Sequence, residues 1–168
     1  RYDVAVLNSL QHIVMEAFDD PQNARMTHVR SPLFTANAHT NDVSSSLASW
    51  LKDGIESHKI LLQVDTSISK QTMNGTEASV GVAASASQKT PHSQVCTLKT
   101  EWDRMTATSV DKKEWRTGED QHTVEYKRFF ALRENLGGVS VQSLNDDDWL
   151  NTCKSGEFPL LRAAQAKC

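Results

Sequence analysis

The first apolar pattern along the chain has the period of an α-helix. Its members recur at steps of three and four residues: Val4, Leu7, Leu10, Val14 and Phe18. Side chains at this spacing share one face, so the pattern predicts an amphipathic helix over residues 4–18 with Asp3 as its N-cap. The same period predicts a second helix over residues 46–59, capped by Ser44 or Ser45. Its apolar face carries Leu47, Trp50, Leu51, Ile55 and His58.

After residue 61 the helical period gives way to alternation. Apolar or β-branched residues alternate with polar ones at Leu62, Val64, Thr66 and Ile68. Alternation of this kind predicts a half-buried strand. The pair Asn74-Gly75 follows, and it suits a type I′ turn because both central residues of that turn need positive φ. With a returning strand over residues 76–82, the sequence predicts a β-hairpin over about 61–83.

The last part of the chain shows helical signals again. The predicted elements are a helix over 123–136, a strand over 139–142, a brief helix from Asn145 or Asp146 to Cys153, and a last helix over 159–166. Gly137 and Gly138 suit a left-handed cap, and Pro159 suits the first position of a helix. For residues 99–116 the apolar spacing favours a helix, whereas the Thr content opposes one.

Together these elements predict an α+β fold with helices at both ends and a central hairpin. The alternative is a mostly helical fold with one hairpin. The chain has 168 residues, a length that fits a single globular domain over 1–168. Only 38% of the residues are hydrophobic, but the formal net charge of −3 is too small for a disordered chain.

Charge and cysteine content limit the partners and leave the compartment open. A slightly acidic chain lacks the clustered basic face of a nucleic-acid-binding protein, and its short apolar runs predict no membrane partner. The chain is therefore expected to be soluble, either cytoplasmic or secreted. The cysteines are Cys96, Cys153 and Cys168, without a C-x-x-C pair. They allow one disulfide and a free thiol, or three thiols.

Few residues offer themselves as a functional site. The carboxylates of Asp146 and Asp148 form a possible hard-cation site, for which a capped helix start is the alternative. Trp115 lies among charged residues and, if exposed, could stack on a ligand or partner. Asn74-Gly75-Thr76 has the pattern of an N-glycosylation acceptor, and it equally suits a tight turn.

The sequence therefore leaves the function, and whether the protein is an enzyme, undecided. It contains no phosphate-binding loop, dinucleotide fingerprint, zinc-protease motif or nucleophile elbow, and it leaves any cofactor unknown. This favours a binding or structural module with a protein or small-molecule partner. The alternative is a hydrolase or lyase, with or without a divalent cation, whose site is assembled only by folding. A third hypothesis is a secreted, glycosylated domain with one disulfide.

Overall fold

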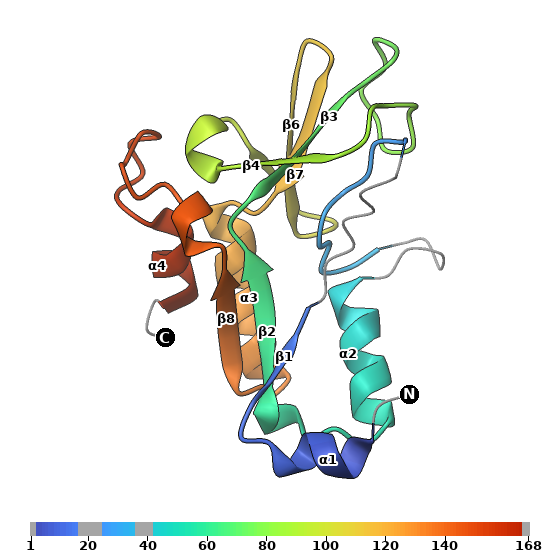
Figure 1. Ribbon diagram of the computed structural model, residues 1–168, viewed down its shortest axis with the longest axis vertical. Helices are drawn as coiled ribbons and strands as arrows, with labels where there is room; N and C mark the ends of the chain where they lie inside the picture. Colours follow the sequence, from blue (N-terminus) through green and yellow to red (C-terminus); the bar gives the residue numbers. More distant parts are fainter. Residues whose placement is uncertain (1–2, 17–24, 36–41, 166–168) are drawn as a thin grey trace.

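The chain folds into a parallel sheet and an antiparallel sheet. The computed structural model describes residues 3–16, 25–35 and 42–165. Its helices are α1 (Val4–Ser9), α2 (Val43–Lys52), α3 (Gln121–Arg133) and α4 (Pro159–Gln165), with the short 3₁₀ segments η1 (Ser57–Lys59), η2 (His92–Gln94) and η3 (Leu144–Asp146). Figure 1 shows the antiparallel sheet above the end of the parallel one.

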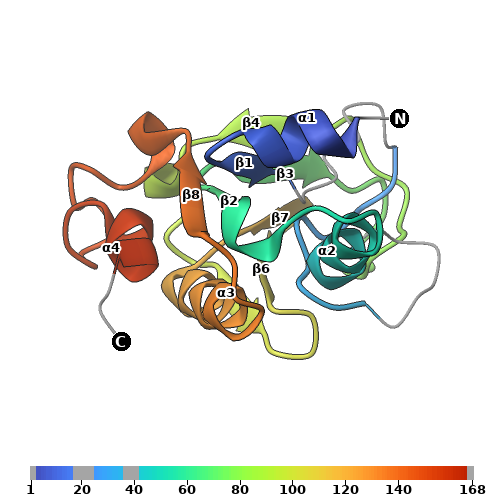
Figure 2. The ribbon, with the colours of Figure 1, turned by 90° about the horizontal axis from the view of Figure 1, so that it is seen from below.

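The parallel sheet buries one of its two faces beneath helices. Its strands, in spatial order, are β1 (Ile13–Met15), β2 (Ile60–Asp65) and β8 (Gly138–Gln142). Helices α2, α3 and α4 lie on the same side of these strands (Figure 2). Because side chains alternate along a strand, every second residue of β2 points toward these helices. Leu62 thus joins the core that contains Phe130, and Val64 packs with Val124.

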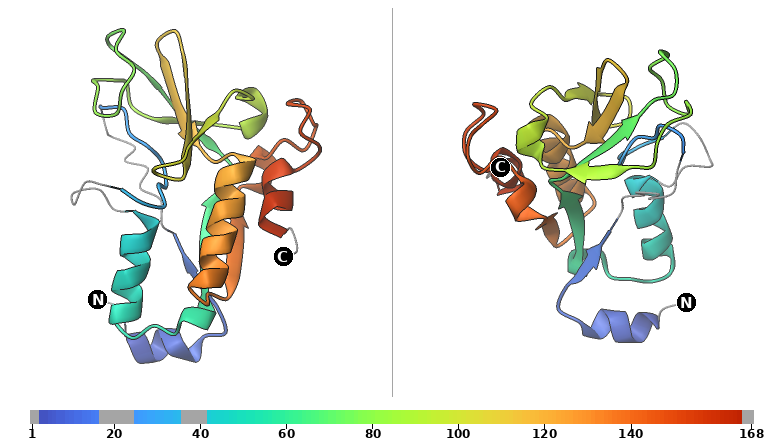
Figure 3. Two further views of the ribbon diagram at one scale, coloured as in Figure 1. Left: turned by 180° about the vertical axis from the view of Figure 1, so that it is seen from behind. Right: turned by 45° about the horizontal axis from the view of Figure 1, so that its top comes forward.

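The antiparallel sheet is a direct continuation of strand β2. Its strands are β3 (Ile68–Thr72), β4 (Gln88–Thr90), β5 (Lys99–Glu101), β6 (Thr106–Asp111) and β7 (Glu114–Gly118), in the spatial order β4-β3-β7-β6-β5. Only Thr66 and Ser67 separate β2 from β3. The chain returns to the parallel sheet through α3, which lies across the back of β2 and β8 (Figure 3, left).

The predicted helices of the amino-terminal half are longer than the observed ones. Helix α1 ends at Ser9, and residues 13–15 form the strand β1. Val14 fits the helical stripe in the sequence, but Ile13 and Met15 are buried while Val14 is exposed, which is the period of a strand. Phe18 lies outside the described residues. Helix α2 ends at Lys52, and its N-cap is Asp42, whose side chain accepts from the Ser45 N–H.

The predicted hairpin over 61–83 is wrong. Strand β2 pairs in parallel with β1 and β8, and β3 pairs with β4 and β7. The chain does reverse after Asn74, whose N–H donates to the carbonyl of Ala83 at 2.9 Å. The returning segment forms two isolated bridges, Met73 with Ala84 and Met26 with Ala83, and no strand over 76–82. The alternation of β2 marks a strand that is buried between two neighbours, and those neighbours are distant in sequence.

The carboxy-terminal predictions are largely confirmed. Helix α3, strand β8 and helix α4 lie where the pattern places them, and Pro159 is the first residue of α4. Gly137 is required for a different reason than capping, because a Cβ there would lie 2.5 Å from the carbonyl oxygen of His58. The brief helix predicted from Asn145 or Asp146 to Cys153 is wrong, since only the 3₁₀ turn η3 forms and turns follow it.

Candidate functional site

The carboxyl edge of the parallel strands is the candidate site. Asp65 at the end of β2 lies directly opposite Gln142 at the end of β8. Glu16 follows the end of the third strand, β1, and is exposed. Ligands of parallel α/β sheets bind at this end, where the loops that follow the strands converge.

Two glutamines line this edge on the sheet face opposite the helices. Gln63 shares its face of β2 with Asp65, because the two are separated by one residue. Its Nε2 donates to Oε1 of Gln142 at 2.8 Å. Gln63 is only 8% exposed, and its own Oε1 is buried without a hydrogen-bond donor among the described residues. A buried acceptor in this state is suited to a donor supplied by a ligand.

Asp65 is held at the same edge by two cations. Arg30 donates from Nη2 to Asp65 at 2.6 Å, and Lys89 of β4 approaches the same oxygen at 3.3 Å. The Ser67 N–H donates to the other carboxylate oxygen at 2.8 Å. Burial alone would raise the pKa of Asp65, but Arg30, Ser67 and Lys89 together hold it below its ordinary value. The side chain is therefore an ionised acceptor fixed in place.

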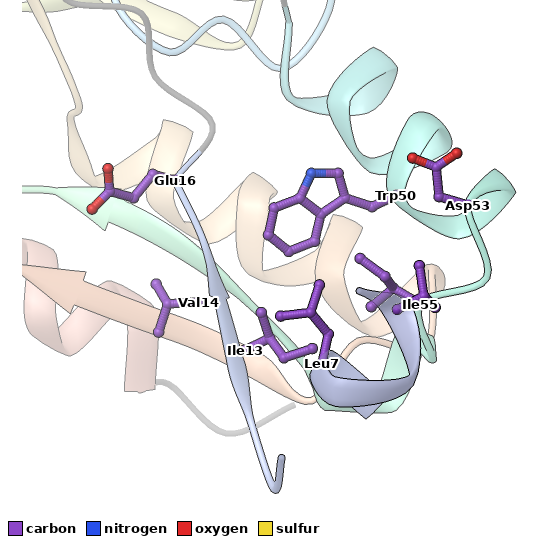
Figure 4. Close-up of a pocket in the computed structure, with 8 residues that line it drawn as sticks. Leu7, Ile13, Val14, Glu16, Trp50, Asp53 and Ile55 are labelled. Carbon is purple, nitrogen blue, oxygen red and sulfur yellow. The ribbon is translucent and has the colours of Figure 1, made fainter. Parts of the chain in front are cut away.

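A pocket of about 630 Å³ adjoins the open edge of strand β1. Its wall is mainly apolar and consists of Val4, Leu7, Ile13, Val14, Trp50 and Ile55. The ring of Trp50 projects from α2 toward β1, while Glu16 and Asp53 lie at the periphery (Figure 4). Pockets that combine an apolar wall with a few polar groups are typical of small-molecule sites.

The predicted metal ligands lie in the segment that follows β8, a few residues beyond Gln142. Asp148 is fully buried, and its carboxylate accepts from the N–H groups of Thr152 and Cys153 at 2.8 and 2.7 Å. The Asp146 carboxylate accepts from the side chain of Asn145. Within the described residues, no three His, Cys, Asp or Glu side chains gather closely enough to hold a metal ion. A metal at Asp146 and Asp148 stays a prediction.

The other predicted site residues lie on the antiparallel sheet. The premise of an exposed Trp115 is corrected, because the ring is 4% exposed and its Nε1 donates to the carbonyl of His28 at 2.7 Å. The exposed tryptophans are Trp102 and Trp149. A ligand contact of Trp115 stays a prediction. Asn74 lies in the exposed turn after β3, as an acceptor site requires.

The structure joins two of the cysteines that the sequence left unassigned. Cys96, which precedes β5, is bonded to Cys153 in the segment between β8 and α4. Cys168 lies outside the described residues. Within the described ranges, every helix is too short or too polar to traverse a bilayer.

Sequence reasoning missed the residues of the carboxyl edge. The alternating pattern predicts that Gln63 and Asp65 lie on the solvent side of a half-buried strand, whereas both are buried. The available signal was their position at the end of an apolar strand, which becomes informative only once the strand is known to be parallel. Arg30 and Gln142 come from distant parts of the chain, so only folding brings them together.

No family model matches the chain, but its sequence is similar to that of curated proteins. The oviduct-specific glycoproteins of Papio anubis and Homo sapiens are each 28% identical over 95% of this chain, which spans 29% and 26% of their lengths. The chitinase-like protein EN03 of Bombyx mori is 37% identical over 51 residues, 30% of this chain and 12% of that protein. The chain thus spans about a third or less of these relatives.

Solved structures show the same fold over nearly the whole chain. Human YKL-39, described as a pseudo-chitinase with retained chitooligosaccharide binding, superposes with a TM-score of 0.89 at 23% identity over 98% of this chain and 52% of its own. Catalytic domain 2 of the Ostrinia furnacalis Group II chitinase gives 0.89 at 18% identity, over 98% and 50%. A GH18 chitinase of Cycas revoluta gives 0.82 at 17% identity, over 98% and 49%. The mixed α/β fold is therefore that of part of a chitinase barrel.

Proposed function

We propose that this domain binds chitooligosaccharides at the carboxyl edge of β2 and β8. The observation that carries the proposal is the match of 95–98% of the chain to the fold of YKL-39, whose structure was also solved in the presence of the tetrasaccharide GlcNAc4. The chain spans only about half of that protein, so the proposal concerns the part of a site that these residues supply.

The groups at this edge suit the chemistry of N-acetylglucosamine. Each sugar unit carries hydroxyl groups and an amide N–H, which can donate to the buried Oε1 of Gln63. The ionised Asp65 is a second acceptor, and Lys89, which is 46% exposed, can donate to a hydroxyl or carbonyl oxygen.

The electrostatics of this edge favour binding over hydrolysis. Glycoside hydrolysis uses a carboxylic acid whose raised pKa lets it donate a proton to the leaving oxygen. Arg30 and Lys89 act on Asp65 in the opposite direction and keep it ionised, although burial opposes them. Asp65 therefore suits the role of a hydrogen-bond acceptor, and we infer binding for the part of the site that these residues supply.

The test is calorimetric titration of the full chain with GlcNAc4. We expect saturable binding, and Gln63→Ala should weaken it about tenfold because it removes one hydrogen-bonding group worth about 1.4 kcal/mol. Gln11→Ala is the matched control, since Gln11 is an exposed glutamine before the amino end of β1. It should bind like the unaltered chain, and thermal unfolding should show that both variants are folded.

Three results would contradict the proposal. Absence of GlcNAc4 binding by the folded chain would refute the function, and unweakened binding by Gln63→Ala would place the site elsewhere. Mass spectrometry of the sugar after incubation tests the chemical assignment. Shorter oligomers would show hydrolysis and overturn the inference that this part of the site favours binding over hydrolysis.

A further inference from the structure

The only Asn-x-Ser/Thr triplet in the chain, Asn74-Gly75-Thr76, lies on an exposed turn. Residues 74–78 are all exposed, and they follow directly after β3 and Met73. Enzymatic attachment of a glycan requires that the acceptor triplet be reached by an enzyme, and exposed loops meet this requirement. Gly75 leaves the middle position without a side chain, so it adds no bulk beside the acceptor amide.

The backbone on which Asn74 sits is fixed, while its side-chain amide is uncommitted. Met73 is buried, and its N–H donates to the carbonyl of Lys113 at 2.7 Å. The Asn74 N–H donates to Ala83 at 2.9 Å. Within the described residues the Asn74 side chain makes no hydrogen bond, so modification of its Nδ2 breaks no contact of the fold.

A second, independent feature points to the compartment in which such a modification occurs. Cys96 and Cys153 form a disulfide that joins the segment before β5 to the segment after β8. Disulfides form and persist in the oxidising lumen of the secretory pathway, where N-glycosylation also takes place, and they are rare in the cytosol. The same chain therefore carries both the acceptor triplet and a disulfide typical of the secretory pathway.

We propose that Asn74 is an N-glycosylation site. The donor is an oligosaccharide linked to a polyisoprenyl diphosphate, and a transferase of the secretory lumen catalyses the step. A bond forms between Nδ2 of Asn74 and the anomeric carbon, and the bond from that carbon to the diphosphate oxygen breaks. The diphosphate leaves with the electron pair, the amide loses one proton, and nothing is oxidised or reduced.

The position of the turn leaves the proposed sugar-binding edge accessible. The loop after β3 lies at the far end of the antiparallel sheet, on the side away from α1, β1 and β2 (Figure 1). Its neighbours are the segment around Ala83 and the turn at Lys113, both in the antiparallel part of the molecule. A glycan at Asn74 shields this end of the sheet and leaves the carboxyl edge of β2 and β8 uncovered.

The test is expression of the full chain, behind a cleavable leader, in a eukaryotic secretory cell. We expect the secreted chain to be heavier than its polypeptide mass and to lose the excess on treatment with peptide N-glycosidase. Treatment in ¹⁸O-labelled water should place the label at residue 74. Asn74→Gln and Thr76→Ala should abolish the mass excess. Thr76→Ser, the matched control, keeps the acceptor pattern and should retain it.

Cell-free translation with microsomes keeps the test independent of folding and secretion. Protection from added protease identifies the chains that have entered the lumen. A mobility shift in these chains that Asn74→Gln removes supports the proposal. Protected chains of unmodified mass, or secreted protein of unmodified mass, would overturn it.

Discussion

Buried carboxylates in this molecule are used to hold backbone segments in place. Asp147 accepts from the N–H groups of Asp148 and Leu161, both at 2.9 Å. Asp148 accepts from those of Thr152 and Cys153. An acidic run that has the composition of a cation site therefore already stabilises the turn between β8 and α4 with its oxygen atoms. Buried N–H groups need such acceptors, since leaving them unpaired costs about 1–3 kcal/mol each.

Asp148→Asn tests this role through pH. We expect a loss of about 2 kcal/mol in the free energy of unfolding at pH 7, because an amide offers a single acceptor oxygen to two N–H donors. Although burial opposes it, hydrogen bonding from Cys153 and Thr152 lowers the pKa of Asp148 in the folded state. Its contribution is therefore full above the unfolded pKa of about 3.9 and is lost as pH falls through the folded value. Urea unfolding at pH 7 and pH 3 should show the difference from the unaltered chain shrinking at low pH.

Asp146→Asn is the control for this prediction, since among the described residues the Asp146 carboxylate accepts only from its neighbour Asn145. It should change stability little at either pH. The same pair tests the predicted metal site. If Asp146 and Asp148 bind a divalent cation, Ca²⁺ or Mg²⁺ should raise the melting temperature of the unaltered chain and of neither variant. An equal loss in both variants at all pH values would contradict the role assigned to Asp148.

The exposure or burial of single residues could be predicted from the sequence only where it depends on neighbouring residues. Exposure of Asn74 could be predicted because turn chemistry is local. Burial of Trp115 could not, since it depends on the carbonyl of His28, which lies 87 residues away. The same holds for Gln63, whose partner Gln142 is 79 residues distant. Residues whose environment is built by distant segments carry no local signal of it.

At the scale of elements, local signals explain which predictions succeeded. Helix α3 begins with a capping box between Asp120 and Thr123, and α4 begins with Pro159. Both signals are local, so the starts of these helices can be predicted from the adjacent residues. The strands β4 and β5 have three residues each and depend on partners elsewhere in the sheet. On β7, Arg116 pairs with Asp111 across the strand turn.

The disulfide is the covalent link between distant elements, and removing it should be costly. Cys96→Ser and Cys153→Ser should each lower the free energy of unfolding by about 4 kcal/mol, because the bond closes a loop with a sequence separation of 57 in the unfolded chain. Denaturant unfolding with and without a reductant measures this loss. The double variant should equal either single variant, since all three lack the same bond. Additive losses would show that the thiols act independently of the disulfide.

At the scale of the whole molecule, the parallel sheet is open at strand β1. In the described residues β1 pairs only with β2, and its residues Ile13 and Val14 line the apolar pocket. The solved chitinases match this chain over about half of their own length, and a complete barrel of parallel strands has no open edge. An open edge beside apolar side chains favours pairing with another chain.

The chain on its own is therefore expected to self-associate through β1. Val14→Lys should reduce this association, because Val14 is 44% exposed on β1 and a charge there opposes pairing. Sedimentation velocity over a range of concentrations measures the effect. Val80→Lys is the matched control, since Val80 is 42% exposed in the loop after β3 and should leave association unchanged. Equal sedimentation of the two variants would rule out β1 as the contact.

The two residues between β2 and β3 have a mechanical consequence. The connection is short, and both of its residues are held by hydrogen bonds. The Thr66 hydroxyl donates to the carbonyl of Ser143 at 2.6 Å, and Arg30 donates to the Ser67 hydroxyl at 2.8 Å. We expect it to restrict rotation between the two sheets. A tilt of the antiparallel sheet would therefore also move the end of β2, where Asp65 lies. The orientation of Asp65 is therefore coupled to the orientation of the antiparallel sheet.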